Sequence, residues 1–437
     1  MAITFLGAKE IKGNTVTVQV QGASLGEMVV FTSESEPKQR QGQIIALEGD
    51  TAIAQVFEGT EGFTLTNTSA RLMGHPLQIA LSEEILGRTF DGLGRPIDGL
   101  GPVSGNTFRD INSSPINPLS RVYPRDFIQT GISAIDLLLT LVRGQKLPIF
   151  SVQGLNHNKL AVQLVSQTAS DNTYLVFAGI GLKFDTYKFF QDAFREMGNS
   201  DRLVTFLNLA DSPVAERLTI PKTALTAAEY LAFDLGYNVL VIITDMTAYC
   251  EALRELSANM GEIPGRKGFP GYMYSNLSAI YERAGIIQNR KGSVTLVPIL
   301  TMPAGDITHP IPDLTGFITE GQIVLDPSLG VYPPINVLPS LSRLMKDGIG
   351  QGRTTADHPK IASDIFAAYA KVGHARDLAQ IIGEDELSPE DKLYIKFGHA
   401  FENEFLQQLP TENRSIQQTM TIAKNILKIP EQTNEQN

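Results

Sequence analysis

The stretch LPIFSVQGLNHNKL, residues 147–160, decides the fold. Its first six residues are apolar apart from one serine, as in a strand that is buried on both faces of a parallel sheet. After it, Leu160, Leu164, Val165 and Thr168 recur at helical spacing. A buried strand followed by a helix is the repeating unit of α/β domains, and such domains bind ligands beyond the carboxyl ends of their strands.

The pattern repeats along the chain outward from this stretch. Four further apolar runs alternate with helical segments, at residues 174–178, 203–207, 238–245 and 293–297. Several fully buried strands separated by helices indicate a parallel sheet. We therefore predict a central α/β RecA-like parallel-sheet domain over residues 71–345.

Both flanks of the chain have other patterns. Short alternating segments near the start, with a turn signal at Gly49-Asp50, predict a small antiparallel β-barrel over residues 1–70. After about residue 345 the strand pattern stops, and helical periodicity at 361–370 and 393–397 predicts an α-helical domain over residues 346–437. The predicted fold is thus multidomain: barrel, parallel-sheet domain and helical domain.

Composition limits the classes of function. The chain has 437 residues, a net charge of −11, 42% hydrophobic and 19% charged residues, which fits a folded globular protein and disfavours nucleic acid as a partner. Its single cysteine, Cys250, excludes an internal disulfide and is expected to be a buried thiol. The start is unlike a signal peptide, and no apolar run reaches membrane-spanning length. These features predict a cytoplasmic protein that meets a membrane only through partners.

The turn after residue 152 resembles a phosphate-binding loop that has lost its key residues. In the pattern GxxxxGK[ST], Gln153 and Asn158 occupy the glycine positions and Leu160 occupies the hydroxyl position. Glycines let backbone N–H groups surround a phosphate, and the hydroxyl is a ligand of magnesium. Only Lys159 matches, and it either attracts a phosphate or is a solvated lysine at a helix start. We expect no nucleotide to be tightly bound by this chain alone.

Asp245 follows the strand at 238–244, in the place of the Walker B carboxylate that helps to hold magnesium. Many buried strands end in aspartate, so this position alone is not specific. Together, Lys159 and Asp245 indicate a degenerate, vestigial nucleotide site, and no metal site is predicted.

Longer strings around these positions resemble the non-catalytic, regulatory B subunit of V/A-type rotary ATPases. The resemblance covers almost the whole chain. It is carried by FIQTGISAID at 127–136, LVRGQKLPIFS at 141–151, ALTAAEYLA at 224–232, PGRKGFPGY at 264–272, HPIPDLTG at 309–316 and LPSLSRL at 338–344.

The resemblance implies an alternating hexamer with a catalytic A subunit, in which ATP and magnesium lie at the A/B interface. Arg343 matches the family's arginine finger, which acts in trans, and Ser342 lies beside it at the interfacial ATP. Leu182 and Lys183 stand where catalytic subunits carry the Glu-Arg that positions the attacking water. The implied partners also include central and peripheral stalk subunits, and the implied process is ATP hydrolysis or synthesis coupled to ion transport, such as hydrogen ion transport, at the cytoplasmic face of a membrane.

Three alternatives compete with this interpretation. A catalytic subunit of a related ring ATPase needs an intact phosphate loop and a glutamate at position 182. A hexameric nucleic-acid motor needs the same loop together with basic and aromatic pore loops. A stand-alone degenerate nucleotide-binding scaffold satisfies the sequence equally well, and co-purification with an A subunit distinguishes it. For Arg343, the alternative role is a surface salt bridge.

Overall fold

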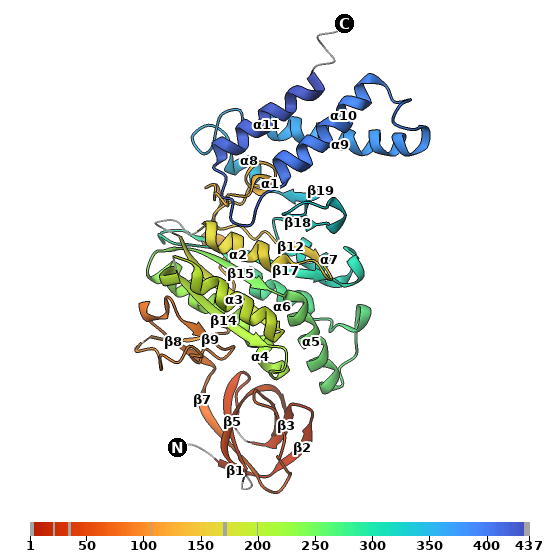
Figure 1. Cartoon of the computed structure of the whole chain (residues 1–437). Helices are drawn as coiled ribbons and strands as arrows, with labels where there is room; N and C mark the ends of the chain where they lie inside the picture. The colour runs from red at the N-terminus through yellow and green to blue at the C-terminus, as the bar shows by residue number, and fades with distance from the viewer. Residues whose placement is uncertain are drawn as a thin grey trace. The chain divides into compact units, whose positions relative to one another are not determined.

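The computed structural model describes residues 4–20, 22–33, 36–105, 107–168, 173–198 and 200–431. The chain divides into two compact units, which are described separately. The first unit comprises residues 1–115, 176–235 and 243–283, and the second comprises residues 116–175, 236–242 and 284–437. Figure 1 labels the helices and strands.

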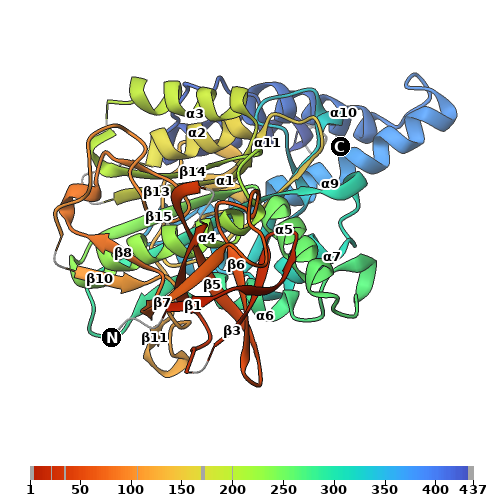
Figure 2. The same cartoon turned by 90° about the horizontal axis from the view of Figure 1, so that it is seen from below.

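The first unit begins with a seven-stranded antiparallel sheet in the order β1-β7-β4-β5-β6-β3-β2. Figure 2 shows these strands curling around one another. Alternating side chains such as Val16, Val18, Ala52 and Ala54 fill the interior, as period-two patterning requires. The predicted turn at Gly49 is confirmed, because Glu48 pairs with Thr51 across it. The strands are β1 (Thr4–Leu6), β2 (Ala8–Lys12), β3 (Thr15–Gln19), β4 (Glu27–Ser33), β5 (Glu36–Glu48), β6 (Thr51–Val56) and β7 (Thr68–Pro76).

The rest of the first unit has α/β character. β14 (Leu203–Leu209) pairs in parallel with β9 (Thr89–Phe90), and Thr205 lies opposite Thr89. Helix α4 is buried along most of its length because its residues are mainly small and apolar. The remaining elements are β8 (Gln78–Leu81), β10 (Thr107–Asp110), most of β13 (Thr173–Leu182), α3 (Phe184–Glu196), α4 (Val214–Glu229), a π-helix (Tyr230–Asp234), α5 (Met246–Met260) and α6 (Met273–Tyr281).

In the second unit the strands run in the order β19-β18-β12-β17-β15. The central strand β12 is parallel to β17 and to β18, and its Ile149 lies opposite Ile299 and Ile323. β19 is antiparallel to β18 and ends next to the C-terminal helices in sequence. The elements are β11 (Arg121–Val122), α1 (Ser133–Leu138), β12 (Ile149–Val152), α2 (His157–Thr168), β15 (Asn238–Thr244), β16 (Gly285–Ile287), β17 (Ser293–Met302), α7 (Pro310–Ile318), β18 (Gly321–Leu325), β19 (Ile335–Ser342) and α8 (Met345–Gly348).

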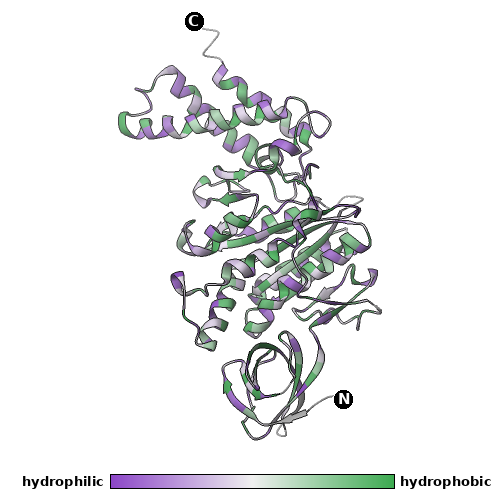
Figure 3. Ribbon diagram, turned by 180° about the vertical axis from the view of Figure 1, so that it is seen from behind, coloured by the Kyte–Doolittle hydropathy of each residue, from purple (hydrophilic) through white to green (hydrophobic). Residues whose placement is uncertain are grey.

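The C-terminal part of the second unit is helical, as predicted. It contains α9 (His358–Ile382), α10 (Pro389–Ala400), a π-helix (Phe401–Leu406) and α11 (Ile416–Glu431). Polar and apolar residues alternate along these helices (Figure 3). The apolar sides meet around a buried aromatic cluster, in which the Phe401 ring lies 4.4 Å from Tyr369 and 5.2 Å from Phe405. Helices of this amphipathic kind are stable because they bury that side.

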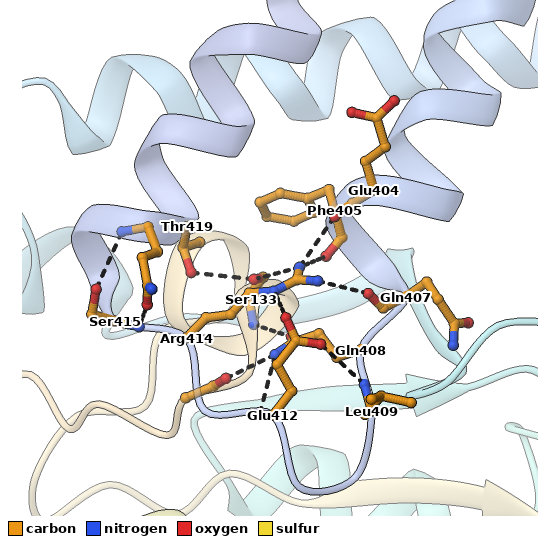
Figure 4. Close-up of polar contacts among 12 residues, drawn as sticks. Ser133, Glu404, Phe405, Gln407, Gln408, Leu409, Glu412, Arg414, Ser415 and Thr419 are labelled. Carbon is orange, nitrogen blue, oxygen red and sulfur yellow. Dashed lines mark hydrogen bonds and ion pairs between the residues drawn. The ribbon is translucent and has the colours of Figure 1, made fainter.

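Arg414 ties this helical part to the first residue of α1 (Figure 4). Its guanidinium donates to the Glu412 carboxylate at 2.6 Å and to the Ser133 hydroxyl at 3.3 Å. It also donates to the main-chain carbonyls of Glu404 and Phe405, at the end of the π-helix, and of Gln407, which follows it; carbonyls at a helix end have no partner within the helix. Arginine therefore serves here as a cap that holds two parts of one unit together.

The predicted fold class is confirmed: an N-terminal β-barrel, a central domain with a parallel sheet and a C-terminal helical domain. The predicted buried thiol is also found, since Cys250 lies inside α5 with no exposed surface, and burial raises its pKa. Within the described ranges, no helix is long and apolar enough to cross a membrane.

Candidate functional site

The turn between β12 and α2 is closed by its own backbone. The Leu155 N–H donates to the Val152 carbonyl at 3.2 Å, and the His157 N–H donates to the Leu155 carbonyl at 2.9 Å. His157 also places its imidazole Nδ1 3.0 Å from the Ser151 hydroxyl. A phosphate-binding loop works by pointing such N–H groups at the ligand. Two of them are committed to internal bonds here, so this turn does not form that nest.

The side chains of the turn do not fit ATP and magnesium either. Leu160 is buried in the core with 1% exposure, where a magnesium-binding hydroxyl would have to face the ligand. Gln153 is exposed, and so is Lys159 in the first turn of α2. Lys159 has no hydrogen bond or ion pair within the described part of the chain, which agrees with the solvated-lysine alternative.

The position of the catalytic glutamate is occupied by an apolar core residue. Leu182, at the end of β13, is 6% exposed. Its side chain lies so close to Gly179 that a Cβ on that glycine would approach it to 2.5 Å. Leucine neither accepts a proton nor orients water, and this side chain is turned into the packing. Lys183 lies on the surface as the residue before α3.

Asp245 belongs to the first unit, whereas Lys159 belongs to the second. The Asp245 carboxylate accepts a hydrogen bond from the Thr247 N–H at 2.8 Å and so caps α5. An aspartate cap satisfies a free N–H at a helix start, and that local role accounts for the residue type. Among the described residues, no group of three histidine, cysteine or acidic side chains is placed to hold a metal.

Arg343 is the second exposed cation among the predicted site residues, beside Lys159. It follows the last residue of β19, and its side chain is exposed. Among the described residues its guanidinium makes a single hydrogen bond, to the Thr319 carbonyl at 3.5 Å. No carboxylate pairs with it in the described ranges. The salt-bridge alternative therefore finds no partner in that part of the chain.

Ser342 has a different environment, although it is adjacent. It is 7% exposed, and its hydroxyl donates to the Thr140 carbonyl at 2.9 Å. The same oxygen accepts a hydrogen bond from the Gln145 side-chain amide at 2.9 Å. A serine hydroxyl has one proton to donate, and that proton is already used inside the chain. Ser342 therefore fixes the strand end from which Arg343 projects.

Sequence reasoning missed the residues that support Arg343. Gln145 and Glu320 were given no role, although Gln145 lies within a string that carries the family resemblance. Gln145 has no exposed surface, and the Arg343 N–H donates to the Glu320 carbonyl at 2.9 Å. No sequence signal identifies the contacts of Gln145, because 175 residues separate it from Glu320 and 197 from Ser342.

A groove of about 530 Å³ opens beside Arg343 in the second unit. Its walls are mainly apolar, and Lys346 adds a second cation. Two apolar wall residues, Leu341 and Phe366, are 52% and 42% exposed. Exposed apolar side chains around a cation are typical of a surface that meets another protein chain.

Comparisons with known proteins cover nearly the whole chain. Residues 9–69 match the beta-barrel domain of the ATP synthase alpha/beta family, residues 131–342 match its nucleotide-binding domain, and residues 347–437 match the C-terminal domain of V and A type ATP synthases. The V-type ATP synthase beta chain of Thermotoga neapolitana is 55% identical over 436 residues, which are 98% of this chain and 95% of that protein. The beta chain of Halothermothrix orenii is 53% identical over 431 residues, 97% of this chain and 93% of the relative.

A solved structure of similar fold is that of the ATP synthase subunit NeqB from Nanoarcheaum equitans. The TM-score is 0.77 at 41% sequence identity, and the match covers 95% of this chain and 99% of that one.

Proposed function

The chain belongs to the family of V-type ATP synthase beta chains, the B subunits of these enzymes, and from this membership we propose that it completes the ATP site of a neighbouring catalytic A subunit with Arg343. In this proposal A and B subunits alternate in a hexamer. ATP and magnesium are held mainly by the A subunit, and this chain contributes no catalytic glutamate. Its own degenerate loop, with Lys159 and Asp245, is vestigial.

The observation that carries the proposal is the unpaired guanidinium of Arg343. Arginine is always charged, and its planar fork matches phosphate oxygens. A cation that is anchored at its base and has no carboxylate partner among the described residues is suited to an anion supplied from outside the chain. A fork in that position stabilises the negative charge that develops on the transferred phosphoryl group.

The vestigial loop supports the division of labour between the subunits. The committed N–H groups of Leu155 and His157 and the buried Leu160 disfavour a second, tightly held ATP on this chain. Leu182 provides no group that activates water. Hydrolysis or synthesis is thus assigned to the A/B interface.

The same proposal extends to the rest of the enzyme. The C-terminal helical domain, proposed to span residues 346–437 after a barrel at 1–70 and a central domain at 71–345, transmits changes at the interface to a central stalk, while a peripheral stalk holds the ring. ATP turnover is in this way coupled to ion translocation at the cytoplasmic face of a membrane, where this chain lies only as part of the complex. Ser342 as a direct ATP contact stays a prediction, because its hydroxyl is engaged internally.

Reconstitution with a cognate A subunit tests the proposal. The purified chain alone is expected to hydrolyse no ATP, and activity is expected to appear on mixing. Arg343→Ala is expected to leave assembly intact and to lower turnover at least about a hundredfold, a cautious value against the range of about 10³–10⁵ for arginine fingers. Lys159→Ala, which removes an exposed cation from the same unit, is the matched comparison and is expected to stay within about twofold.

The outcomes separate the alternatives. An Arg343→Ala complex that assembles and keeps most of its turnover would remove the in-trans role. Failure of the chain to associate with any A subunit would favour a stand-alone scaffold. Turnover by the chain alone that is lost in Asp245→Ala would favour a catalytic subunit.

A further inference from the structure

The structure assigns to Gln145 the part of a positioning residue, which fixes the main chain beneath Arg343 and so sets where the guanidinium can reach. This inference rests on the proposed function of Arg343. It concerns a residue that makes no hydrogen bond to the guanidinium within the described ranges, and it acts through Ser342 and Glu320.

Gln145 lies in the turn that leads into β12, with no exposed surface. Its side-chain carbonyl accepts the Val142 N–H at 2.9 Å. Its side-chain amide donates to the Ser342 hydroxyl at 2.9 Å and to the Glu320 carbonyl at 3.3 Å. A buried amide cannot exchange its hydrogen bonds within the protein for hydrogen bonds to water. These three bonds therefore hold the Gln145 side chain in one orientation.

Each of the two acceptors of that amide is one step from Arg343. Ser342 precedes Arg343 in the chain. Its hydroxyl accepts the bond from Gln145 and donates to the Thr140 carbonyl at 2.9 Å. The Glu320 carbonyl receives the Arg343 N–H at 2.9 Å. Gln145 therefore bonds both to the residue before Arg343 and to the carbonyl that holds the Arg343 backbone.

Glu320 does not use its carboxylate on Arg343. One carboxylate oxygen lies 2.5 Å from the Lys146 ammonium, and the other accepts the Lys146 N–H at 2.7 Å. The side chain of Lys146 is buried, so this carboxylate is neutralised and held in place. The arrangement leaves the guanidinium of Arg343 without the partner that an adjacent acidic residue would otherwise offer.

Positioning matters because arginine fingers act through geometry. A displacement of about 1 Å in a group that stabilises a transition state can cost on the order of a hundredfold in rate. Without the Gln145 side chain, the end of β19 keeps its main-chain bond to Glu320 and the bond from Ser342 to Thr140, but Ser342 loses the second bond to its hydroxyl. We expect the guanidinium of Arg343 to be present but to spend less time in the position that stabilises the transferred phosphoryl group.

The test is a double-substitution cycle in the reconstituted complex with an A subunit. Gln145→Leu removes all three side-chain bonds and keeps an apolar side chain of similar size. It is expected to lower kcat at least about tenfold, with KM for Mg·ATP within about twofold, since the A subunit holds the ground-state nucleotide. In an Arg343→Ala background the same change is expected to lower kcat by less than about twofold further, because the group it positions is gone.

A matched control and a second variant keep the test decisive. Gln167→Leu removes another glutamine whose amide donates to a main-chain carbonyl, that of Glu412 at 2.9 Å, and is expected to leave kcat within about twofold.

If Gln145→Leu does not assemble, Ser342→Ala replaces it. This variant removes the hydrogen bond between Gln145 and Ser342 but leaves the Gln145 amide its bond to the Glu320 carbonyl. It is expected to show the same dependence on Arg343.

An unchanged kcat in an assembled Gln145→Leu or Ser342→Ala complex overturns the inference. So does an equal loss with and without Arg343, since that pattern means a general structural defect. If Arg343→Ala alone keeps its turnover, the proposed function itself fails. This last outcome is distinct, because it is read from the single variant before the cycle is completed.

Discussion

Arg343 and Arg414 lie in the same unit, and the fold uses them in opposite ways. The Arg414 side chain is 11% exposed and makes five hydrogen bonds, to Glu412, to Ser133 and to three main-chain carbonyls. Arg343 is exposed and makes one, at the 3.5 Å limit. An arginine whose three guanidinium nitrogens are all hydrogen-bonded within the chain serves stability, whereas one held by its backbone and by a single long side-chain bond is available to a partner.

The same contrast holds between the end of β19 and the turn after β12. In the turn, N–H groups that a phosphate would need are bonded internally, and Leu160 is buried. At β19, the hydrogen bonds of Ser342 and Glu320 hold the backbone and leave the cation free of carboxylates among the described residues. Phosphate binding is therefore disfavoured at the turn, where N–H groups are bonded internally, and a role at a neighbour's ATP site is proposed for Arg343 at the end of β19.

The largest effect on stability is expected from Arg414→Ala. It removes the arginine donor of three carbonyls at the end of the π-helix and one of the two donors to the Glu412 carboxylate, at a cost of about 3 kcal/mol in the free energy of unfolding. Arg343→Ala is expected to change that free energy by less than about 0.5 kcal/mol. Urea unfolding of both variants, followed by helix content, makes the comparison. Equal losses for the two variants would abolish the distinction drawn between these arginines.

A smaller loss is expected when a hydroxyl is restored to the turn. Leu160→Thr removes buried apolar surface and buries a hydroxyl, which together cost about 2 kcal/mol. Because the Leu155 and His157 N–H groups stay engaged, no gain in Mg·ATP affinity should accompany it. Unfolding and titration calorimetry on the isolated chain measure both quantities. Micromolar ATP binding by this variant would show that the turn reopens readily, contrary to the internal bonding described.

Replacing Arg343 by lysine tests whether the planar shape of the guanidinium matters in addition to its charge. Arg343→Lys keeps the positive charge but loses the planar fork, so the reconstituted complex is expected to lose at least about tenfold in kcat, or about 1.4 kcal/mol. Stability and assembly should match those of the unaltered complex. Full turnover in the lysine variant would mean that charge alone suffices and that orientation of the fork contributes little.

The smallest expected effect is a change in the pH dependence of stability. It concerns a third arginine, Arg88 in the first unit, which stabilises the fold as Arg414 does. It donates to both carboxylate oxygens of Asp98, at 2.5 and 2.9 Å, and this hydrogen bonding lowers the Asp98 pKa from 3.8 to about 2. A lowered folded-state pKa means that Asp98 stabilises the protein above about pH 4, and that the contribution is lost as the pH falls toward 2.

The thermal midpoints of the unaltered protein and Asp98→Asn, measured from pH 7 down to pH 2.5, check this. The gap between them is expected to be widest near neutral pH and to narrow in the acidic range. A gap that widens on acidification would contradict the sign of the pKa shift.

Much of the fold followed from the sequence because its signals are local. The apolar run at 147–152, the turn at Gly49 and the helical periodicity of 361–370 each depend on neighbours a few residues away. Each element is found, the first of them as β12 over Ile149–Val152. The missing glycines and the leucine at 182 could likewise be read directly, because a lost functional group is a property of one position.

The sequence could not predict which hydrogen-bond and ion-pair partners the polar groups have. Whether Arg343 has a carboxylate partner, and whether the Leu155 N–H is free, depends on atoms brought together by folding. Gln145 reaches Ser342 across 197 residues and Glu320 across 175, and nothing in the local pattern of either marks the pairing. The sequence by itself determined the elements and the loss of catalytic groups. Only the tertiary structure decided which polar groups are hydrogen-bonded within the chain and which cations stay exposed without a carboxylate partner, because hydrogen bonds are satisfied in space and not along the chain.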